Sequence, residues 1–284
     1  PERIGRLPDS AGMPNEIVVH RSHRLNYDQM YRLAGARLVE IGVPYETERW
    51  ELERAITERT AAIAYVDSRN VGPGALPFAT VVEIARARGV PTIVDAASTV
   101  PPLSHLHCWS GWGADLVIFS GGKGIRGPQD SGLLAGRANL IAAARANGSP
   151  NSGIGRGMKV SKEAMAGLWK ALDLFQLADH AADFAAHLAQ ADVLCDALGS
   201  RPDLWTAIEG DWADRPAPVV RVFPQRDAWS PEAVRRDLMR PAPGTPAIHV
   251  DVQRGGLQIS THCLLPGQEL VIARRLGEIL GPGQ

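Results

Sequence analysis

Two residues of this sequence combine a reactive side chain with a position at the end of an apolar run. Asp95 closes the run PTIVD, and Lys123 follows the run DLVIF within the glycine-rich segment SGGKG. A carboxylate at the end of a buried strand loses hydration and needs a partner, although it can also cap a helix or lie at the surface. A lysine in such a turn can act as an amine nucleophile or simply bind a phosphate.

The common phosphate- and dinucleotide-binding motifs do not account for this lysine. Val117 stands where a Walker motif has its first glycine, and Gly124 replaces the Ser or Thr that follows the Walker lysine. No GxGxxG opens a helix either. An Asp and a Lys that each end a buried strand suggest pyridoxal 5′-phosphate, because the lysine can bind the cofactor aldehyde and the carboxylate can keep the pyridine nitrogen protonated. The spacing alone leaves the other interpretations open.

Strand-like runs alternate with helical segments through the first half of the chain. We expect helices at 26–35, 48–56, 78–88 and 138–146, and strands at 16–20, 37–41, 61–66, 91–95, 115–119 and 131–135. Because the strands are almost wholly apolar, this α/β pattern predicts a mostly parallel sheet with helices on both faces. Ligands bind at the carboxyl ends of such strands, where Asp95 and Lys123 fall.

The pattern changes after residue 160. A long helical stretch over 161–198 precedes a final region with predicted helices at 231–239 and 268–280 and strands at 205–212, 219–223, 248–253 and 257–262. We therefore predict a large cofactor-binding domain over 1–160, a bridging long helix over 161–200, and a small C-terminal α+β domain over 201–284.

The segments IVDAAS and ADLVIFSGGKGIRGPQDSGLLAGR resemble the fold type I pyridoxal-phosphate enzymes. Within that class they look most like the selenocysteine synthase-like group, which includes D-glucosaminate-6-phosphate ammonia-lyase-like proteins. The stretches IGRGMKVSKEAMAGLWKAL and LPGQELVIARRL also resemble this group, so the similarity covers nearly the whole chain. The resemblance implies an aminotransferase-like large domain that binds pyridoxal 5′-phosphate.

The resemblance also implies roles for individual residues. It makes Lys123 the Schiff-base lysine, Asp95 the partner of the pyridine nitrogen, and Ser120 a residue that helps to hold the cofactor phosphate. Relatives place an aromatic or histidine ring over the cofactor, for which we choose His23, with His20 second. Each histidine can equally be a core or surface residue. Ser98, and more weakly Asn70, match positions near the cofactor hydroxyl.

Three basic residues in glycine-containing loops are candidates for substrate binding. Arg126, Arg156 and Lys159 could bind a carboxylate or phosphate, and Arg156 is preferred because GIGRGMK is a tight context. The alternative is that these are solvated surface charges. The HLHC cluster at 105–108 lacks further ligands at a recognised spacing, so we expect no metal.

Composition limits the classes of function. The 284 residues carry 30 Lys+Arg and 31 Asp+Glu, so the formal charge of −1 argues against a general nucleic-acid binder. No apolar run approaches the length of a transmembrane helix, and three cysteines are compatible with the cytoplasm. The chain starts at Pro1, without the N-terminal part that relatives of this group normally carry, so we expect the cofactor-binding domain over 1–160 to be incomplete at its N-terminus.

The family resemblance implies a pyridoxal-phosphate-dependent lyase. It would act on an amino acid or amino-sugar acid by Cα deprotonation and β-elimination, as a homodimer or larger even oligomer. Two alternatives stay open: a selenium transferase-like enzyme on charged tRNA, and a non-catalytic remnant or scaffold of the same fold. The overall charge weighs against the tRNA alternative.

Overall fold

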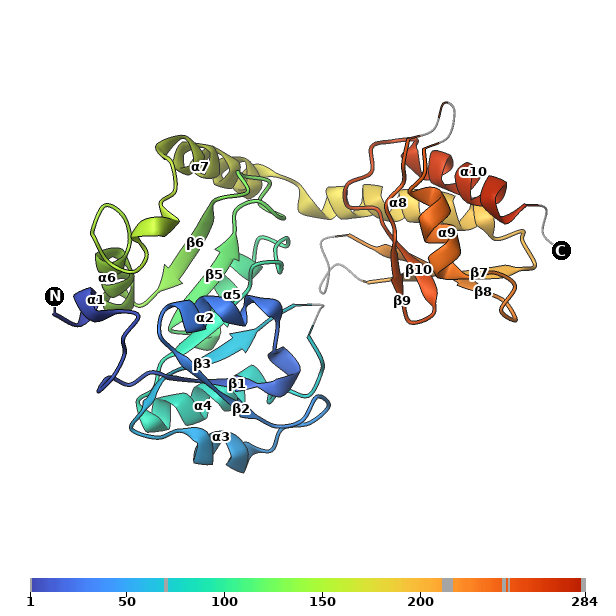
Figure 1. Cartoon of the computed structure of the whole chain (residues 1–284). Coiled ribbons are helices and arrows are strands. Elements are labelled where there is room, and N and C mark those ends of the chain that lie inside the picture. Colours follow the sequence, from blue (N-terminus) through green and yellow to red (C-terminus); the bar gives the residue numbers. More distant parts are fainter. Residues whose placement is uncertain (1, 69–70, 211–216, 242–243, 245, 282–284) are drawn as a thin grey trace. The chain divides into compact units, whose positions relative to one another are not determined.

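The chain forms two compact units, Pro1–Ala178 and Asp179–Gln284, each folded around its own apolar core. A computed structural model describes residues 2–68, 71–210, 217–241, 244 and 246–281 (Figure 1). Asn70, one of the weaker candidates for the cofactor site, lies outside these described residues.

A six-stranded sheet with the order β2-β1-β3-β4-β5-β6 forms the centre of the first unit (Figure 1). Strands β1 to β5 pair in parallel, and β6 runs antiparallel to β5. The mostly parallel sheet predicted from the sequence is confirmed. The strands are β1 (Glu16–His20), β2 (Arg37–Ile41), β3 (Thr60–Val66), β4 (Thr92–Asp95), β5 (Leu116–Ser120) and β6 (Gly132–Gly136).

The strand order reverses at β1, because β2 lies on one side of it and β3 on the other. In open α/β sheets such a reversal opens a crevice at the carboxyl ends of the strands, which is the usual ligand site. The carboxyl ends of β1, β3, β4 and β5 are His20, Val66, Asp95 and Ser120. The candidate cofactor residues therefore gather at one edge of this sheet.

Helices pack against one face of the sheet, and the side chains between them form the first apolar core. Side chains from α3, α4, α5 and α7 join strand residues there, among them Leu52, Val81, Trp109, Phe175, Ile63 and Phe119. The helices of this unit are α1 (Glu2–Arg6), α2 (Gln29–Leu33), α3 (Arg49–Ala55), α4 (Phe78–Arg88), α5 (His105–Trp112), α6 (Ala138–Asn147) and α7 (Lys162–Leu177), with single 3₁₀ turns at Arg21–His23, Asn26–Asp28 and Arg156–Met158. Helix α5 was not predicted, because the HLHC sequence was considered only as a possible metal cluster.

The helix predicted as continuous over 161–198 is two helices. Helix α7 ends at Leu177, Ala178 is extended with ψ 143°, and α8 (His180–Leu198) begins after Asp179. The Asp179 carboxylate accepts a hydrogen bond of 2.9 Å from the amide of Ala182, which caps the second helix. The expected single bridging helix over 161–200 is therefore wrong. Apolar residues continue across the break and conceal it, whereas the capping aspartate is a start signal that the sequence does contain.

The second unit is a small α+β fold, as expected. Its antiparallel sheet has the order β7-β8-β10-β9 and packs against helices through Leu194, Val220, Leu238, Leu257 and Leu276, which are fully buried or nearly so. The elements are α8, α9 (Pro231–Leu238), α10 (Gln268–Leu280), β7 (Leu204–Glu209), β8 (Val219–Pro224), β9 (Asp251–Gln253) and β10 (Gly256–Ser260). Within the described parts of both units, no helix combines the length and apolar character needed to cross a bilayer.

Candidate active site

Strand register places Asp95 and Ser120 on the same face of the sheet. Asp95 pairs with Ile118 across β4 and β5, and Ser120 lies two residues beyond Ile118. Paired residues and residues two apart on a strand share a face, and strand spacings put these two Cα atoms roughly 8 Å apart. Val94, the neighbour of Asp95, belongs to the first core, so the Asp95 side chain points away from that core.

The half-buried Asp95 carboxylate is held at one oxygen. The Oδ1 atom of Asp95 accepts a hydrogen bond of 3.0 Å from the backbone amide of Ala97. The backbone carbonyl oxygen of Asp95 accepts one of 2.9 Å from the amide of Asp67. Ser98 is half-buried in the turn that follows, which the Thr99 amide closes by donating to the Ala96 carbonyl at 3.2 Å. The backbone thus orients Asp95 at the carboxyl end of β4.

The turn that carries Lys123 is tightly packed. A Cβ atom on Gly124 would lie 1.9 Å from the Val100 carbonyl oxygen, and one on Gly122 would lie 2.6 Å from the Gln129 Cα atom. The turn also closes on itself, since the amide of Arg126 donates to the Lys123 carbonyl at 2.8 Å. Lys123 itself is exposed, and within the described ranges no hydrogen bond or ion pair holds its amine. The glycines therefore fix the backbone and leave the amine available.

His20 and His23 are both buried, in contact with an aromatic cluster. The rings of His23 and Tyr65 pack edge-on with their centroids 4.6 Å apart, and the ring centroids of His20 and His23 are 5.2 Å apart. The Val66 amide donates to Nδ1 of His23 at 3.2 Å, which places the proton of the neutral ring on Nε2. Burial lowers the pKa of each histidine to about 4. His23 is 3% exposed, so its placement over a cofactor ring stays a prediction.

Tyr31 is a residue near this site that the sequence analysis missed. It lies on α2, and burial, the Asp95 carboxylate and then Asp28 raise the pKa of its phenol to about 12. The phenol of Tyr31 is therefore electrostatically coupled to Asp95, the predicted cofactor ligand. The sequence signal that could have identified Tyr31 is its place on the helix after β1, because the strand order reverses at β1.

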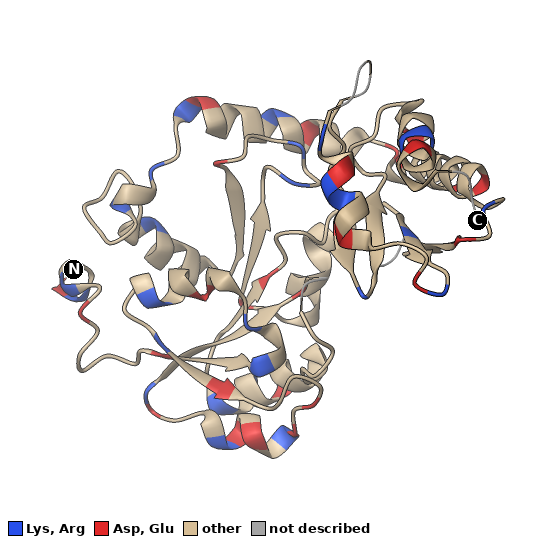
Figure 2. Cartoon of the chain, turned by 45° about the vertical axis from the view of Figure 1, so that its right-hand side comes forward, with Lys and Arg blue, Asp and Glu red and all other residues tan. Residues whose placement is uncertain are grey.

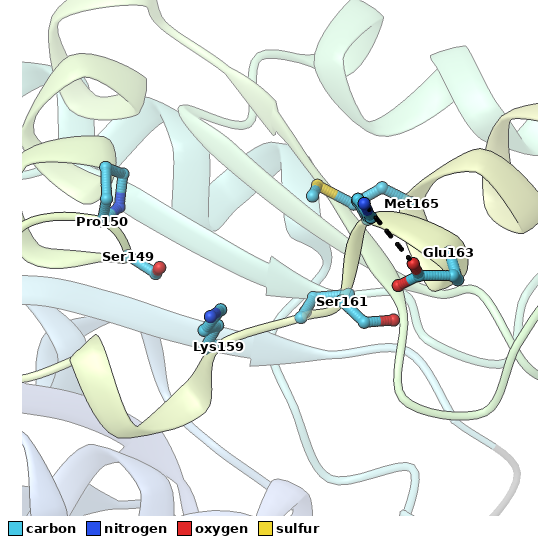
Figure 3. Close-up of a pocket in the computed structure, with 8 residues that line it drawn as sticks. Ser149, Pro150, Lys159, Ser161, Glu163 and Met165 are labelled. Atoms are coloured by element: carbon cyan, nitrogen blue, oxygen red, sulfur yellow. Dashed lines mark ion pairs between the residues drawn. The ribbon is translucent and has the colours of Figure 1, made fainter.

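Of the three basic candidates, Lys159 lines a cavity and Arg156 contacts another of the residues that line it. Arg156 donates from Nη1 to the Ser149 hydroxyl at 3.1 Å, and Ser149 and Lys159 both line a cavity of about 590 Å³. Figure 3 shows Ser149 and Pro150 on one side of this cavity and Glu163 and Met165 on the other, where Glu163 forms an ion pair of 3.9 Å with Lys162. Arg126 instead lies in the Lys123 turn, with a positive φ of 61°.

The HLHC cluster forms a helix and not a recognisable metal centre. The segment lies on α5, where the Nδ1 atom of His105 is 2.8 Å from the Thr99 carbonyl oxygen. Over the part of the chain that the structure describes, no group of three His, Cys, Asp or Glu residues could hold a metal ion.

Known proteins resemble this chain in both sequence and fold. The class-V aminotransferase profile matches residues 16–156. The chain is 39% identical over 225 residues to D-glucosaminate-6-phosphate ammonia lyase of Salmonella typhimurium, covering 78% of this chain and 58% of the relative. It is 37% identical over 291 residues to 5′-C-glycyluridine monooxygenase-decarboxylase of a Streptomyces species, covering 98% of this chain and 70% of the relative. A solved D-glucosaminate-6-phosphate ammonia-lyase superposes with a TM-score of 0.79 at 33% identity, covering 98% of this chain and 74% of that chain.

The chain belongs to the class-V aminotransferase family. Within these fold type I enzymes it is similar to D-glucosaminate-6-phosphate ammonia lyase, and L-seryl-tRNA(Sec) selenium transferase of Solidesulfovibrio magneticus is a more distant relative at 27% identity. The resemblance stated from the Lys123 segment is therefore confirmed. This chain spans 58% of the Salmonella protein, 70% of the Streptomyces protein and 56% of the selenium transferase.

Pyridoxal 5′-phosphate is the cofactor of this family, and the strand-end residues fit it. An exposed amine on a turn that admits no side chain beside it suits attachment of an aldehyde. An oriented carboxylate on the neighbouring strand suits a protonated pyridine nitrogen. Lys123 and Asp95 would hold the two opposite ends of that ring system, while Ser120 shares the face of Asp95.

Proposed function

We propose that this chain is a pyridoxal-phosphate-dependent lyase that acts on an amino acid or amino-sugar acid. The observation that carries the proposal is that Asp95 ends β4 while Lys123 lies in the turn after β5, the parallel strand paired with β4. The similarity to D-glucosaminate-6-phosphate ammonia lyase supports elimination as the reaction and an acidic amino sugar as the substrate class.

The residues have distinct roles in this proposal. The bound cofactor supplies an electron-accepting ring conjugated to the substrate nitrogen. Lys123 would hold the cofactor through its amine, and that amine, once released by the substrate, would take the proton from the substrate Cα atom. Asp95 keeps the ring nitrogen protonated and so stabilises the negative charge that develops at Cα. A leaving group then departs from Cβ, and Ser120, Ser98 and His23 position the cofactor.

We propose Arg156 and Lys159 as the groups that bind the acidic part of the substrate. Their support is the cavity of about 590 Å³ to which Lys159 and the Arg156-bound Ser149 contribute. A guanidinium fork can bind two oxygens of a carboxylate or phosphate at once. Arg126 is proposed for the same role from the Lys123 turn.

The assignment of Lys123 is tested by covalent trapping. Purified chain is mixed with pyridoxal 5′-phosphate and reduced with borohydride, and the labelled peptide is located by mass spectrometry. We expect the label on Lys123 and its loss in Lys123→Ala, whereas Lys170→Ala removes an exposed lysine of α7 and serves as the matched control. Equal labelling of both variants would contradict the assignment.

A second candidate activity is oxidative decarboxylation of an amino acid group. It is favoured by the similarity to 5′-C-glycyluridine monooxygenase-decarboxylase, which extends over 98% of this chain. The two activities are separated by their products, because elimination releases ammonia without consuming oxygen, whereas a monooxygenase-decarboxylase consumes oxygen and releases carbon dioxide. Parallel measurement of ammonia, oxygen and carbon dioxide therefore decides between them.

The tRNA alternative has less support. The selenium transferase matches are more distant than the two relatives above. Figure 2 shows basic and acidic residues interspersed along the elements, in keeping with the formal charge of −1. A salt-dependent tRNA-binding assay tests this alternative.

We further propose a cytoplasmic homodimer or larger even oligomer. The support for association is apolar surface around α2, where Tyr27, Met30 and Leu33 are 70%, 52% and 52% exposed. The cytoplasmic location is supported by Cys108, Cys195 and Cys263, which are free thiols. Light scattering of the purified chain tests the oligomeric state.

A further inference from the structure

A second cavity lies wholly within the C-terminal unit, away in sequence from every residue assigned above. Its volume is about 430 Å³, within the range of small-molecule sites. The segment before β9, the end of β10 and the first turns of α10 form its walls. The lining residues on which the argument depends are Ile248, His249, Ile259, Gln268, Val271 and Arg274.

The chemistry of the walls is mainly apolar. Ile248, Ile259 and Ile272 are buried, and Val271 and Leu264 are half-buried beside them. The segment before β9 is anchored, since the Ile248 amide donates to the Leu238 carbonyl at 2.9 Å. An apolar wall held by secondary structure suits a rigid hydrocarbon or aromatic group.

The polar lining groups favour an anion. Arg274 is the one permanently charged side chain among the described lining residues, none of which is a carboxylate. Outside the lining, Glu278 lies one turn further along α10, with its Oε1 atom 3.9 Å from the Arg274 Nε atom. His249 offers ring nitrogens, while Gln268 accepts a hydrogen bond from the Leu265 amide at 3.0 Å and keeps its own amide N–H groups as donors.

We propose that this cavity binds an amphipathic organic anion, with the apolar body against Ile248, Ile259 and Val271 and the anionic group at Arg274. The lining residues belong to the second unit, whereas all of the proposed cofactor residues belong to the first. Binding here requires neither pyridoxal phosphate nor activity, so the proposal stands or fails independently of the proposed lyase function.

A pair of fluorescent probes tests this site on the full chain. One is 8-anilinonaphthalene-1-sulfonate, and the other is N-phenyl-1-naphthylamine, which keeps the same rings without the sulfonate. We expect saturable binding of one molecule of the sulfonate, with the neutral probe about tenfold weaker because it lacks a charge-assisted contact. Arg274→Gln should weaken the sulfonate by about tenfold and leave the neutral probe unchanged.

Matched variants separate the cavity from general surface charge. Arg236→Gln removes an exposed arginine of α9 outside the lining and should change neither affinity. Val271→Phe should fill the cavity and abolish binding of both probes, with circular dichroism to establish that it folds. Equal affinity for the two probes, or equal weakening by Arg274→Gln and Arg236→Gln, overturns the proposal. These two comparisons remain decisive if Val271→Phe does not fold.

Discussion

Gly124→Ala is the substitution that most directly tests the geometry of the Lys123 turn. The new Cβ atom would lie 1.9 Å from the Val100 carbonyl oxygen and 2.7 Å from the carbonyl carbon. Both atoms belong to the backbone, so no side-chain rotation relieves the contact, and the turn must move by about 1 Å. Forcing extra atoms into a packed site costs about 3 kcal/mol at the upper end of typical values. At 2–4 °C per kcal/mol, we expect the Tm to fall by roughly 6–12 °C.

The same displacement moves the neighbouring Lys123, so we expect the affinity for the cofactor to fall by at least about tenfold. A tenfold change corresponds to a loss of only about 1.4 kcal/mol of binding free energy. The assay is thermal unfolding by circular dichroism, together with titration of pyridoxal 5′-phosphate monitored by absorbance. Gly111→Ala is the control, because its Cβ atom meets nothing within 4 Å on helix α5 and should leave both quantities intact or raise stability. If Gly124→Ala behaves like this control, the close approach of the turn to Val100 is refuted.

Four further substitutions test titratable and charged side chains elsewhere in the fold. Burial raises the pKa of Asp115, but hydrogen bonds from Thr92 and Arg137 outweigh burial and hold this pKa below its ordinary value. Asp115→Asn should therefore lower the free energy of unfolding by about 1–2 kcal/mol at pH 7. In urea unfolding series, the variant should also lose less stability than the parent protein as the pH falls below about 4. Because the pKa of His20 is about 4, the folded protein should lose stability as the pH falls from 6.5 to 4. His20→Phe should make this decline in the free energy of unfolding shallower, as measured by urea unfolding across that pH range. An unchanged slope would contradict the lowered pKa of His20. The Nε atom of Arg221, 3% exposed, donates to the Oε2 atom of Glu209 at 3.0 Å; Glu209→Gln should lower the free energy of unfolding by about 3 kcal/mol and Arg221→Met by less, because only the first leaves a buried charge.

Local patterns predicted most of the elements that build the site. The run TIVD and the glycine-rich turn around Lys123 were predictable from local sequence, because short apolar runs bounded by turn residues form buried strands of a parallel sheet. The start and end of α10 were predicted to the residue at Gln268 and Leu280. The break between α7 and α8 was missed because apolar periodicity continues past Ala178, although the cap at Asp179 is a local signal.

The sequence by itself determined the alternation of strands and helices, the edge of the sheet where Asp95 and Lys123 fall, and the family to which both belong. Only the tertiary structure decided that His23 packs edge-on against Tyr65, that the Asp95 charge raises the pKa of Tyr31, and that Lys159 and Ser149 line one cavity. The physical reason is the range of the interactions. Hydrogen bonds within a turn and the period of apolar residues act between neighbours in the chain. Burial and electrostatic coupling depend on which distant segments the completed fold brings into contact.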